Sequence, residues 1–301
     1  MGGRRNQVQT TVSESHEAEL SEDVPINLIS ADQFTVDELT HFYNQSRIDY
    51  IVPMPMNAAK LRAYIDAYDV ALEHSAVAIQ NDQVLGLSML GVRPQRTWIT
   101  RLGVIPVRRR NGAGGALMQH HIERSLELKA KYVMLEVIEN NEPAYRLFLK
   151  LGFCETRKLL ILRRPPSPPK IDVPPYEMEV LDEPQALALL ETRRSTPSWL
   201  DDFPSLCNVG NMKALKVATA DGGRGWLAYQ SSIFQLGRLV LQTEAGDPAE
   251  MARVMAHALH TQHPAQDTKT ENISLDDPHL PGLYAMGYIE SFRRIEMRLD
   301  F

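Results

Sequence analysis

A proline-rich segment, Pro165–Pro175 (PPSPPKIDVPP), imposes the strongest constraint on how this chain can fold. Each proline removes a backbone donor and fixes φ, so neither a helix nor a central strand can continue through the segment. The chain has 301 residues, which is long for one domain and sufficient for two. We therefore predict two compact units, residues 25–164 and 176–301, joined by the spacer 165–175 and preceded by a disordered leader, residues 1–24.

The apolar pattern before the spacer mixes helices with strands. Helical spacing of apolar residues is found over Thr35–Tyr43, Ala58–Tyr68 and Ala113–Leu128. Strand patterns, alternating or rich in β-branched residues, are found over Trp98–Ile105 and Tyr132–Ile138. This mixture predicts an α/β fold.

The two predicted units share a pattern at their ends. The C-terminal sequence GLYAMGYIESFRRIEMRLDF is similar to YRLFLKLGFCETRKLLILRR, which closes the first unit. Both sequences contain an aromatic-bearing helix, a Gly-aromatic corner and then a strand. The repeat favours two related domains in tandem.

Charge and composition argue against several classes of protein. The net charge of −6 argues against a broad nucleic-acid face and mildly favours cationic substrates, unless it serves solubility alone. Cys154 and Cys207 form neither a zinc motif nor a disulfide framework. No apolar run approaches the roughly 20 residues of a membrane helix, and the N-terminus lacks the apolar region of a signal peptide. We predict a cytoplasmic protein, monomer or homodimer, that binds no metal, nucleic acid or membrane.

The segment Leu102–Met118 (LGVIPVRRRNGAGGALM) indicates a binding site for a phosphate group. A strand runs into a tight turn containing Gly112, Gly114 and Gly115, and a helix begins there. Glycines let the backbone approach a ligand closely, and the free N–H groups at a helix start attract an anion. Arg108–Arg110 add cations beside the turn, so the segment suits a pyrophosphate.

Two other phosphate-binding motifs fit this segment poorly. A P-loop requires a Lys-Ser or Lys-Thr pair after its glycines, and none is present. A dinucleotide-binding loop directly follows the first strand of its domain, whereas this loop comes after several strands and helices.

Two motifs in this order resemble the GCN5-related N-acetyltransferase (GNAT) family. The first, V-x-P-x-x-[RQ]-x-x-G-x-[GA], is matched by Val104, Pro106, Arg109, Gly112 and Gly114, with Leu117 following. The second, N-x-x-A-x-x-[LF]-[YF]-x-x-x-G-F, is matched by Asn141, Ala144, Leu147, Phe148, Gly152 and Phe153. The resemblance covers residues 25–164 and is much fainter over residues 176–301.

The resemblance implies two tandem GNAT-like domains, each with a mixed, mostly antiparallel central sheet flanked by helices. It also implies acetyl-CoA, with its pyrophosphate on the loop amides and its pantetheine arm paired with the strand before the loop. That strand splays from Tyr132–Ile138, and a backbone amide near Val104 polarises the acetyl oxygen. The implied acetyl-CoA-binding residues are Leu102, Gly103, Val104, Arg109, Arg110, Asn111, Gly112, Ala113, Gly114, Gly115, Asn141 and Phe148.

The resemblance also implies direct attack by an amine, which needs a proton acceptor. Glu136 in Leu135-Glu136-Val137 is the best candidate, with Glu139 as a rival. Relatives often donate a proton to the thiolate from a tyrosine, but this chain has Phe148 at that place. Water, another residue, or Tyr145 in a rotated helix would have to replace it. For Asn141, a helix N-cap is an alternative role to the CoA contact.

The second unit departs from the family pattern at the place of the glycine loop. Glu244–Met255 (EAGDPAEMARVM) has one glycine, and Asp247 and Glu250 would repel a pyrophosphate. We expect no CoA there, and predict that this unit packs on the first and shapes its acceptor cleft. The predicted function is transfer of an acetyl group from acetyl-CoA to a primary amine, on a small molecule or a peptide N-terminus. The alternative is a non-catalytic acyl-CoA-binding sensor or regulatory module, which Phe148 slightly favours.

Overall fold

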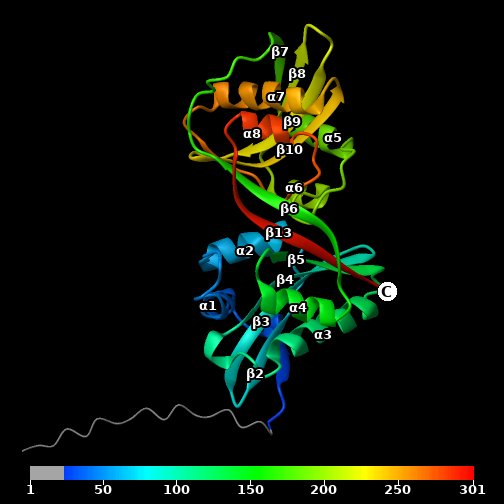
Figure 1. Ribbon diagram of the computed structural model, residues 1–301. Helices are drawn as coiled ribbons and strands as arrows, with labels where there is room; N and C mark the ends of the chain where they lie inside the picture. The colour runs from blue at the N-terminus through cyan, green and yellow to red at the C-terminus, as the bar shows by residue number, and fades with distance from the viewer. Residues whose placement is uncertain (1–23) are drawn as a thin grey trace, which may run out of the picture.

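The computed structural model describes residues 24–301, so nearly all of the predicted leader lies outside the described residues. One continuous 13-stranded sheet runs through the described chain, in the order β1-β2-β3-β4-β5-β13-β6-β11-β10-β9-β8-β7, with β12 beside β6 (Figure 1). The strands are β1 Asn27–Ser30, β2 Ala76–Gln80, β3 Gln83–Arg93, β4 Arg96–Val104, β5 Tyr132–Ile138, β6 Cys154–Arg164, β7 Tyr176–Leu181, β8 Met212–Thr219, β9 Arg224–Ser231, β10 Gln235–Ala245, β11 Asp267–Lys269, β12 Ile273–Ser274 and β13 Ile289–Asp300. The α-helices are α1 Val36–Ser46, α2 Ala58–Ala67, α3 Ala113–Glu127, α4 Glu142–Lys150, α5 Glu183–Glu191, α6 Phe203–Val209, α7 Pro248–Gln262 and α8 Leu280–Ala285.

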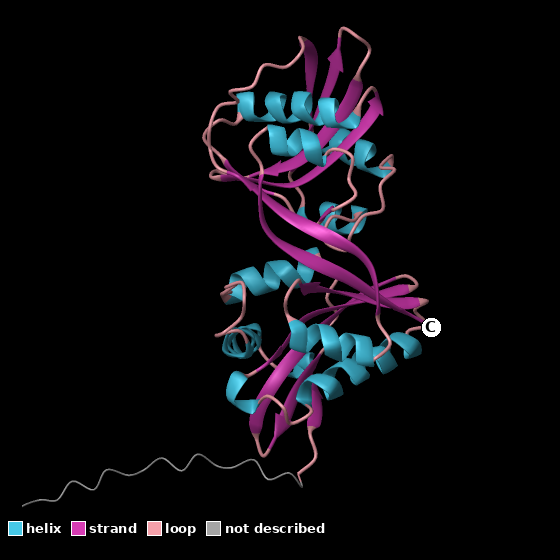
Figure 2. Ribbon diagram, in the orientation of Figure 1, coloured by secondary structure: helices cyan, strands magenta, loops and turns pink. Residues whose placement is uncertain are grey.

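The first unit is a sheet with helices on both faces (Figure 2). Because side chains alternate along a strand, Val77 packs in the core beneath α1 and α2, whereas its neighbours Ala76 and Ala78 pack beneath α3. Only β4 and β5 are parallel among the neighbouring strands from β1 to β5. The mixed, mostly antiparallel fold predicted from the sequence is confirmed.

The second unit has the same layered arrangement. In β8, Leu215 and Val217 face α7 and α8, whereas Met212 and Ala214 face α5 and α6. The strand that the sequence pattern predicts at the end of this unit is β13. The sequence patterns do not predict β7, α5 or α6.

The two long strands β6 and β13 belong to both units. β13 lies antiparallel to β5 on one side and to β6 on the other, with Ile295 opposite Val137 and Lys158. β6 in turn pairs with β11 and β12. The sequence-based division assigns β13 to the second unit, yet this strand completes the sheet of the first, and the C-terminus lies beside that unit (Figure 1). The sheet therefore does not end at the proline spacer, since β6 before it and β13 after it lie side by side.

Buried contacts from the second unit hold it against the first. The indole of Trp199 stacks on that of Trp98, with ring centroids 5.6 Å apart, and its Nε1 donates to the carbonyl of Tyr68 at 2.9 Å. Arg93, 4% exposed, forms a 3.0 Å ion pair with Asp202. These contacts fix one wall of the site described below. Among residues 24–301, no helix combines the length and hydrophobicity needed to cross a bilayer.

Candidate functional site

The parallel strands β4 and β5 separate at their C-terminal ends. They pair from Arg96 opposite Tyr132 to Ile99 opposite Leu135, and their pairing ends there. A β-bulge follows at once in β4, where Arg101 has a φ of 55° and the register against β3 shifts. The splay implied by the family resemblance is therefore present, and it opens a gap between the two strands.

The edge of β4 that faces this gap carries unpaired backbone groups. The N–H of Ile105 donates to the carbonyl of Leu85 on β3 at 2.8 Å. Since backbone groups alternate along an antiparallel pair, those of Val104 and Leu102 point the other way, into the gap. Their carbonyls accept side-chain donors there, from Arg109 at 3.1 Å and from Arg47 at 3.1 Å respectively.

The glycine loop leaves the start of α3 without a capping side chain. Gly112 is the N-cap residue, has a φ of 91° and offers no side-chain acceptor. Within residues 24–301, no side chain accepts from the N–H of Gly114 or Gly115, although Asn111 Oδ1 accepts from Ala113 N–H at 3.2 Å. The Nδ2 of Asn111 is buried and has no partner among the described atoms. Free donors at a helix start are the groups that hold a phosphate.

The signature arginine lies beside this loop but is paired within the chain. Both terminal nitrogens of Arg109 donate to Asp49, each at 2.7 Å, and this contact lowers the pKa of Asp49. Both side chains are partly exposed, at 42% and 48%. Of the other arginines in the run, Arg108 donates to the carbonyl of Val84 and Arg110 is exposed.

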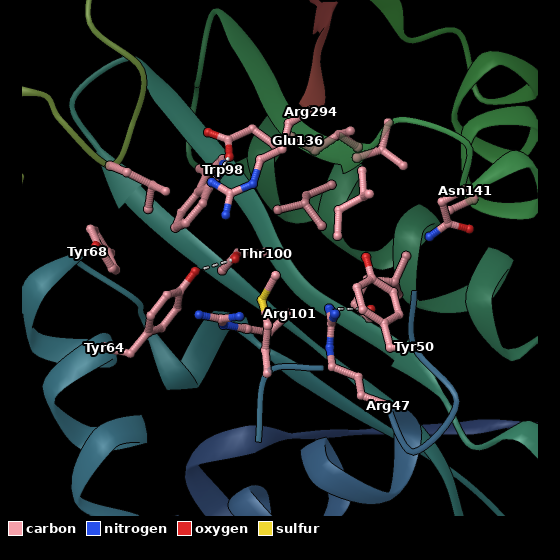
Figure 3. Close-up of a pocket in the computed structure, with 18 of the residues that line it drawn as sticks. Arg47, Tyr50, Tyr64, Tyr68, Trp98, Thr100, Arg101, Glu136, Asn141 and Arg294 are labelled. Atoms are coloured by element: carbon pink, nitrogen blue, oxygen red, sulfur yellow. Dashed lines mark hydrogen bonds and ion pairs between the residues drawn. The ribbon is translucent and has the colours of Figure 1, made fainter. Parts of the chain in front are cut away.

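A cavity of about 280 Å³ fills the gap between β4 and β5 (Figure 3). Its lining comes from both units and from the loop between α1 and α2. Among the predicted site residues it contains Leu102, Glu136, Asn141 and Phe148, and beyond these it includes Arg47, Tyr50, Tyr64, Tyr68, Trp98, Arg101, Leu200, Lys269, Glu271 and Arg294.

Glu136 is the buried carboxylate of this cavity, with a side chain only 6% exposed. Asn272 donates to it at 2.8 Å, and Arg294 of β13 lies 3.2 Å away. Burial raises the pKa of Glu136 to about 7, even though Arg294 and Asn272 favour its charged form. A carboxylate with such a pKa can both accept and release a proton near neutrality.

The motif at α4 brings Asn141 and Phe148 to the lining of the cavity. Asn141 is the N-cap residue of α4 but makes no side-chain capping bond, and its amide is directed toward the cavity (Figure 3). The capping role considered for it is therefore absent. Phe148 is buried beside Phe153, with ring centroids 6.2 Å apart.

The two alternative catalytic residues are occupied outside the cavity. Tyr145 donates its hydroxyl to Glu155 in an exposed contact, so it cannot replace the tyrosine that Phe148 displaces. Glu139 accepts from Lys158 at 2.6 Å and does not line the cavity.

Several lining residues were not identified from the sequence. Arg101 carried a usable signal, because an arginine inside an apolar strand is rarely buried without a purpose. Glu271, Asn272 and Arg294 carried none, since only the long-range pairing of β13 and β12 with the first unit brings them to Glu136. Tyr50 comes from the loop between α1 and α2.

In the second unit, the corresponding helix α7 has a side-chain cap at its N-terminus. Asp247 is the N-cap of α7, and its carboxylate accepts from the N–H of Glu250 at 2.9 Å. The next residue, Pro248, has no N–H to offer. A carboxylate of the chain itself thus occupies the position where the first unit has open donors.

A splayed strand pair, an uncapped glycine loop and a repeated layered fold together define a tandem GNAT-type architecture. Residues 37–153, which include the loop, β4, β5 and α4, match the model of the acetyltransferase (GNAT) family. Among described residues, no group of three or more His, Cys, Asp or Glu side chains is arranged to hold a metal ion.

Solved structures with this fold cover nearly the whole chain. The chain is similar to a tandem GNAT protein from the clavulanic acid biosynthesis pathway, at 16% identity and a TM-score of 0.64, over 92% of this chain and 98% of that one. It is similar to a GCN5-related N-acetyltransferase from Sphaerobacter thermophilus, at 15% identity and a TM-score of 0.64, over 91% and 95%. A GCN5-related glucosamine N-acetyltransferase region of a fungal multi-domain β-N-acetylglucosaminidase aligns at 14% identity and a TM-score of 0.68, over 94% and 39%. At these identities the likeness is one of fold, and comparison with curated proteins finds no match.

Proposed function

We propose that the first unit transfers an acetyl group from acetyl-CoA to a primary amine held in the cavity between β4 and β5. The observation that carries this proposal is Glu136, a buried carboxylate with a pKa of about 7 beside the free edge of β4. In the reaction, the amine nitrogen bonds to the thioester carbonyl carbon, the C–S bond breaks, CoA leaves as its thiolate, and the amine loses a proton.

The free edge of β4 and the glycine loop would bind different parts of acetyl-CoA. The amides of residues 110–115 would hold the pyrophosphate, and a Cβ at Gly115 would meet open space, so the loop has room for a ligand. The edge Leu102–Val104 would pair with the pantetheine arm, with Asn141 beside it. The N–H of Val104, which points into the gap, would donate to the acetyl oxygen.

Glu136 would take the proton that the amine must lose. Asn272 and Arg294 position its carboxylate and keep part of it ionised near pH 7, although burial opposes the charge. For the leaving thiolate we propose Tyr50 as proton donor. Figure 3 shows Tyr50 on the same side of the cavity as Asn141, and no hydrogen bond occupies its hydroxyl among the described residues.

The second unit would bind no CoA and would act by completing the cavity. Its Leu200, Lys269 and Glu271 line the acceptor side, and Asp247 closes its own helix start. A division into units at 165–175, a cytoplasmic location and a monomeric or homodimeric state stay predictions.

The first experiment is calorimetric titration of the full-length protein with acetyl-CoA, followed by a thiol-release assay with a panel of primary amines. We expect one site per chain and turnover with a subset of amines. Two sites would contradict the silent second unit. Binding without turnover of any amine would favour the sensor function, and absence of binding would remove the acetyl-CoA assignment.

A further inference from the structure

We propose that the amine acceptor also carries an anionic group, a carboxylate or a phosphate, and that Arg101 binds it. This proposal rests on the function above and names the class of its acceptor. It follows from the charge of the cavity, from the contacts of Arg101 and from the position of Arg101 relative to Glu136.

The cavity is cationic although the chain is acidic. Its lining contains four cationic side chains and two carboxylates, whereas the chain as a whole has a net charge of −6. The cations are Arg47, Arg101, Lys269 and Arg294, and the carboxylates are Glu136 and Glu271. A cationic lining attracts an anionic ligand and disfavours a purely cationic one. The overall charge, which mildly favoured cationic substrates, is therefore a poor guide to this site.

Both carboxylates of the cavity form ion pairs with cations other than Arg101. Arg294 lies 3.2 Å from Glu136 and 3.4 Å from Glu271, and Lys269 lies 3.5 Å from Glu271. Arg101 has no carboxylate within ion-pair distance among residues 24–301. The surplus positive charge therefore includes Arg101.

Neutral groups alone hold Arg101 in place. One terminal nitrogen donates to the hydroxyl of Tyr43 at 3.1 Å, and the guanidinium lies 3.8 Å from the ring centroid of Tyr64. Its Nε is buried and has no hydrogen-bond partner in the described chain. A buried donor that is left without a hydrogen-bond partner is costly. Because its planar fork matches a carboxylate or phosphate, an anionic ligand would satisfy it.

Arg47 is less suited to this role. It donates to the carbonyl of Leu102 at 3.1 Å, on the strand edge assigned to the pantetheine arm, and it stacks on Tyr50 at 4.2 Å. Its place is therefore on the acetyl-CoA side of the cavity.

The positions of Arg101 and Glu136 suit one small molecule with two ends. They project into the cavity from the two splayed strands, with Tyr64 and Trp98 to one side (Figure 3). A volume of about 280 Å³ lies just below the roughly 300–1,000 Å³ of typical ligand pockets, so the cavity suits a small acceptor. An amine directed at Glu136 can thus carry its anionic group to Arg101 across a short carbon skeleton.

The test is calorimetric titration of the full-length protein saturated with CoA, which allows binding without turnover. Two matched pairs are compared: O-phosphoethanolamine against ethanolamine, and β-alanine against propylamine. We expect the anionic member of at least one pair to bind roughly tenfold more tightly, as for a charge-assisted hydrogen bond. The pair with the larger ratio tells phosphate from carboxylate.

The matched variants are Arg101→Gln, Arg101→Lys and, as a control, Arg62→Gln, which removes an exposed arginine from α2. Arg101→Gln should abolish the preference, Arg101→Lys should retain part of it, and Arg62→Gln should leave it unchanged. Thermal unfolding confirms that each variant is folded. Equal affinities within both pairs, or a preference that survives Arg101→Gln, would overturn the proposal.

Turnover with acetyl-CoA is measured separately. If neutral amines are acetylated and anionic ones gain nothing, only the acceptor class is wrong. If anionic amines bind but no amine is acetylated, the transferase function is wrong and the binding role of Arg101 stands.

Discussion

The helices α3 and α7 begin at equivalent places in the two units, yet only α7 has a side-chain cap from its N-cap residue. At α3 the N-cap is Gly112, with a φ of 91° and no side chain to use the first donors. At α7 the N-cap is Asp247, whose carboxylate takes one donor, and Pro248 removes another. The helix is therefore present in both units. The residues at its start, Gly112 in one and Asp247-Pro248 in the other, determine whether its first N–H groups are free for a ligand or used by a cap.

The same comparison explains why the second unit is still needed. Its helix α7 is capped by its own Asp247, but the unit supplies Asn272 and Glu271 around Glu136, and Trp199 against Trp98. One unit thus carries the loop, and the other supplies Asn272 and Arg294, which favour the charged form of Glu136 against the effect of burial.

The largest expected effect comes from placing a carboxylate at the start of α3, as already exists at α7. Gly114→Glu should abolish detectable acetyl-CoA binding in calorimetry, because the new charge occupies the phosphate site. A Cβ at Gly114 would meet Leu147 and Val104 at 3.6 Å, an ordinary contact, so the fold should survive. The matched control is Ala249→Glu, two residues after the N-cap of α7, which should leave binding unchanged. Near-normal affinity in Gly114→Glu would remove the loop assignment.

The next largest effect is expected at Glu136, which lies on β5 of the first unit and contacts Asn272 and Arg294 of the second. Glu136→Gln should lower kcat by about 100- to 10,000-fold, the usual range for a general base, with less effect on KM. In the wild type, activity should rise with pH through about 7, as the raised pKa requires the carboxyl to lose its proton before it can act. That limb should disappear in Glu136→Gln. Glu139→Gln, which affects only the pair with Lys158, is the control. A wild-type profile retained in Glu136→Gln would exclude it as the base.

The fold and the loop were accessible from the sequence because their signals are local. Glycine spacing, a preceding strand and a following helix define the start of α3 within 17 residues, Leu102–Met118. The environment of Glu136 is not local, since Arg294 reaches it only because β13 pairs with β5 across 158 positions of sequence. Asp49 and Arg109 likewise meet through a loop whose path has no periodic pattern. Contacts between residues so far apart in the chain leave no recognisable pattern in a single sequence.

A smaller effect is expected at Tyr50, the hydroxyl proposed to replace the tyrosine that the family motif has at the position of Phe148. Tyr50→Phe should lower kcat by roughly tenfold, less than for a typical general acid, because a thiol with a pKa near 8.5 is a good leaving group. An assay of thiol release measures kcat. The affinity for acetyl-CoA should change little. Tyr145→Phe removes an exposed hydroxyl bonded to Glu155 and serves as the control. Equal rates for both variants would assign the proton to water.

The smallest expected effect is a gain in acetyl-CoA affinity rather than a loss. It concerns Asp49, the carboxylate that pairs with Arg109 beside the glycine loop. Asp247 closes α7 from within the helix, whereas Asp49 reaches α3 from a loop and holds Arg109, with both side chains partly exposed. Exposed ion pairs contribute about 0.2–1 kcal/mol, so Asp49→Asn should tighten acetyl-CoA binding by about twofold to fivefold, and less at high salt. Asp66→Asn, which removes an exposed charge from α2, is the control. Weaker binding in Asp49→Asn would mean that Asp49 orients Arg109 for the ligand. The carboxylate near α3 would then favour phosphate binding, whereas Asp247 at α7 opposes it.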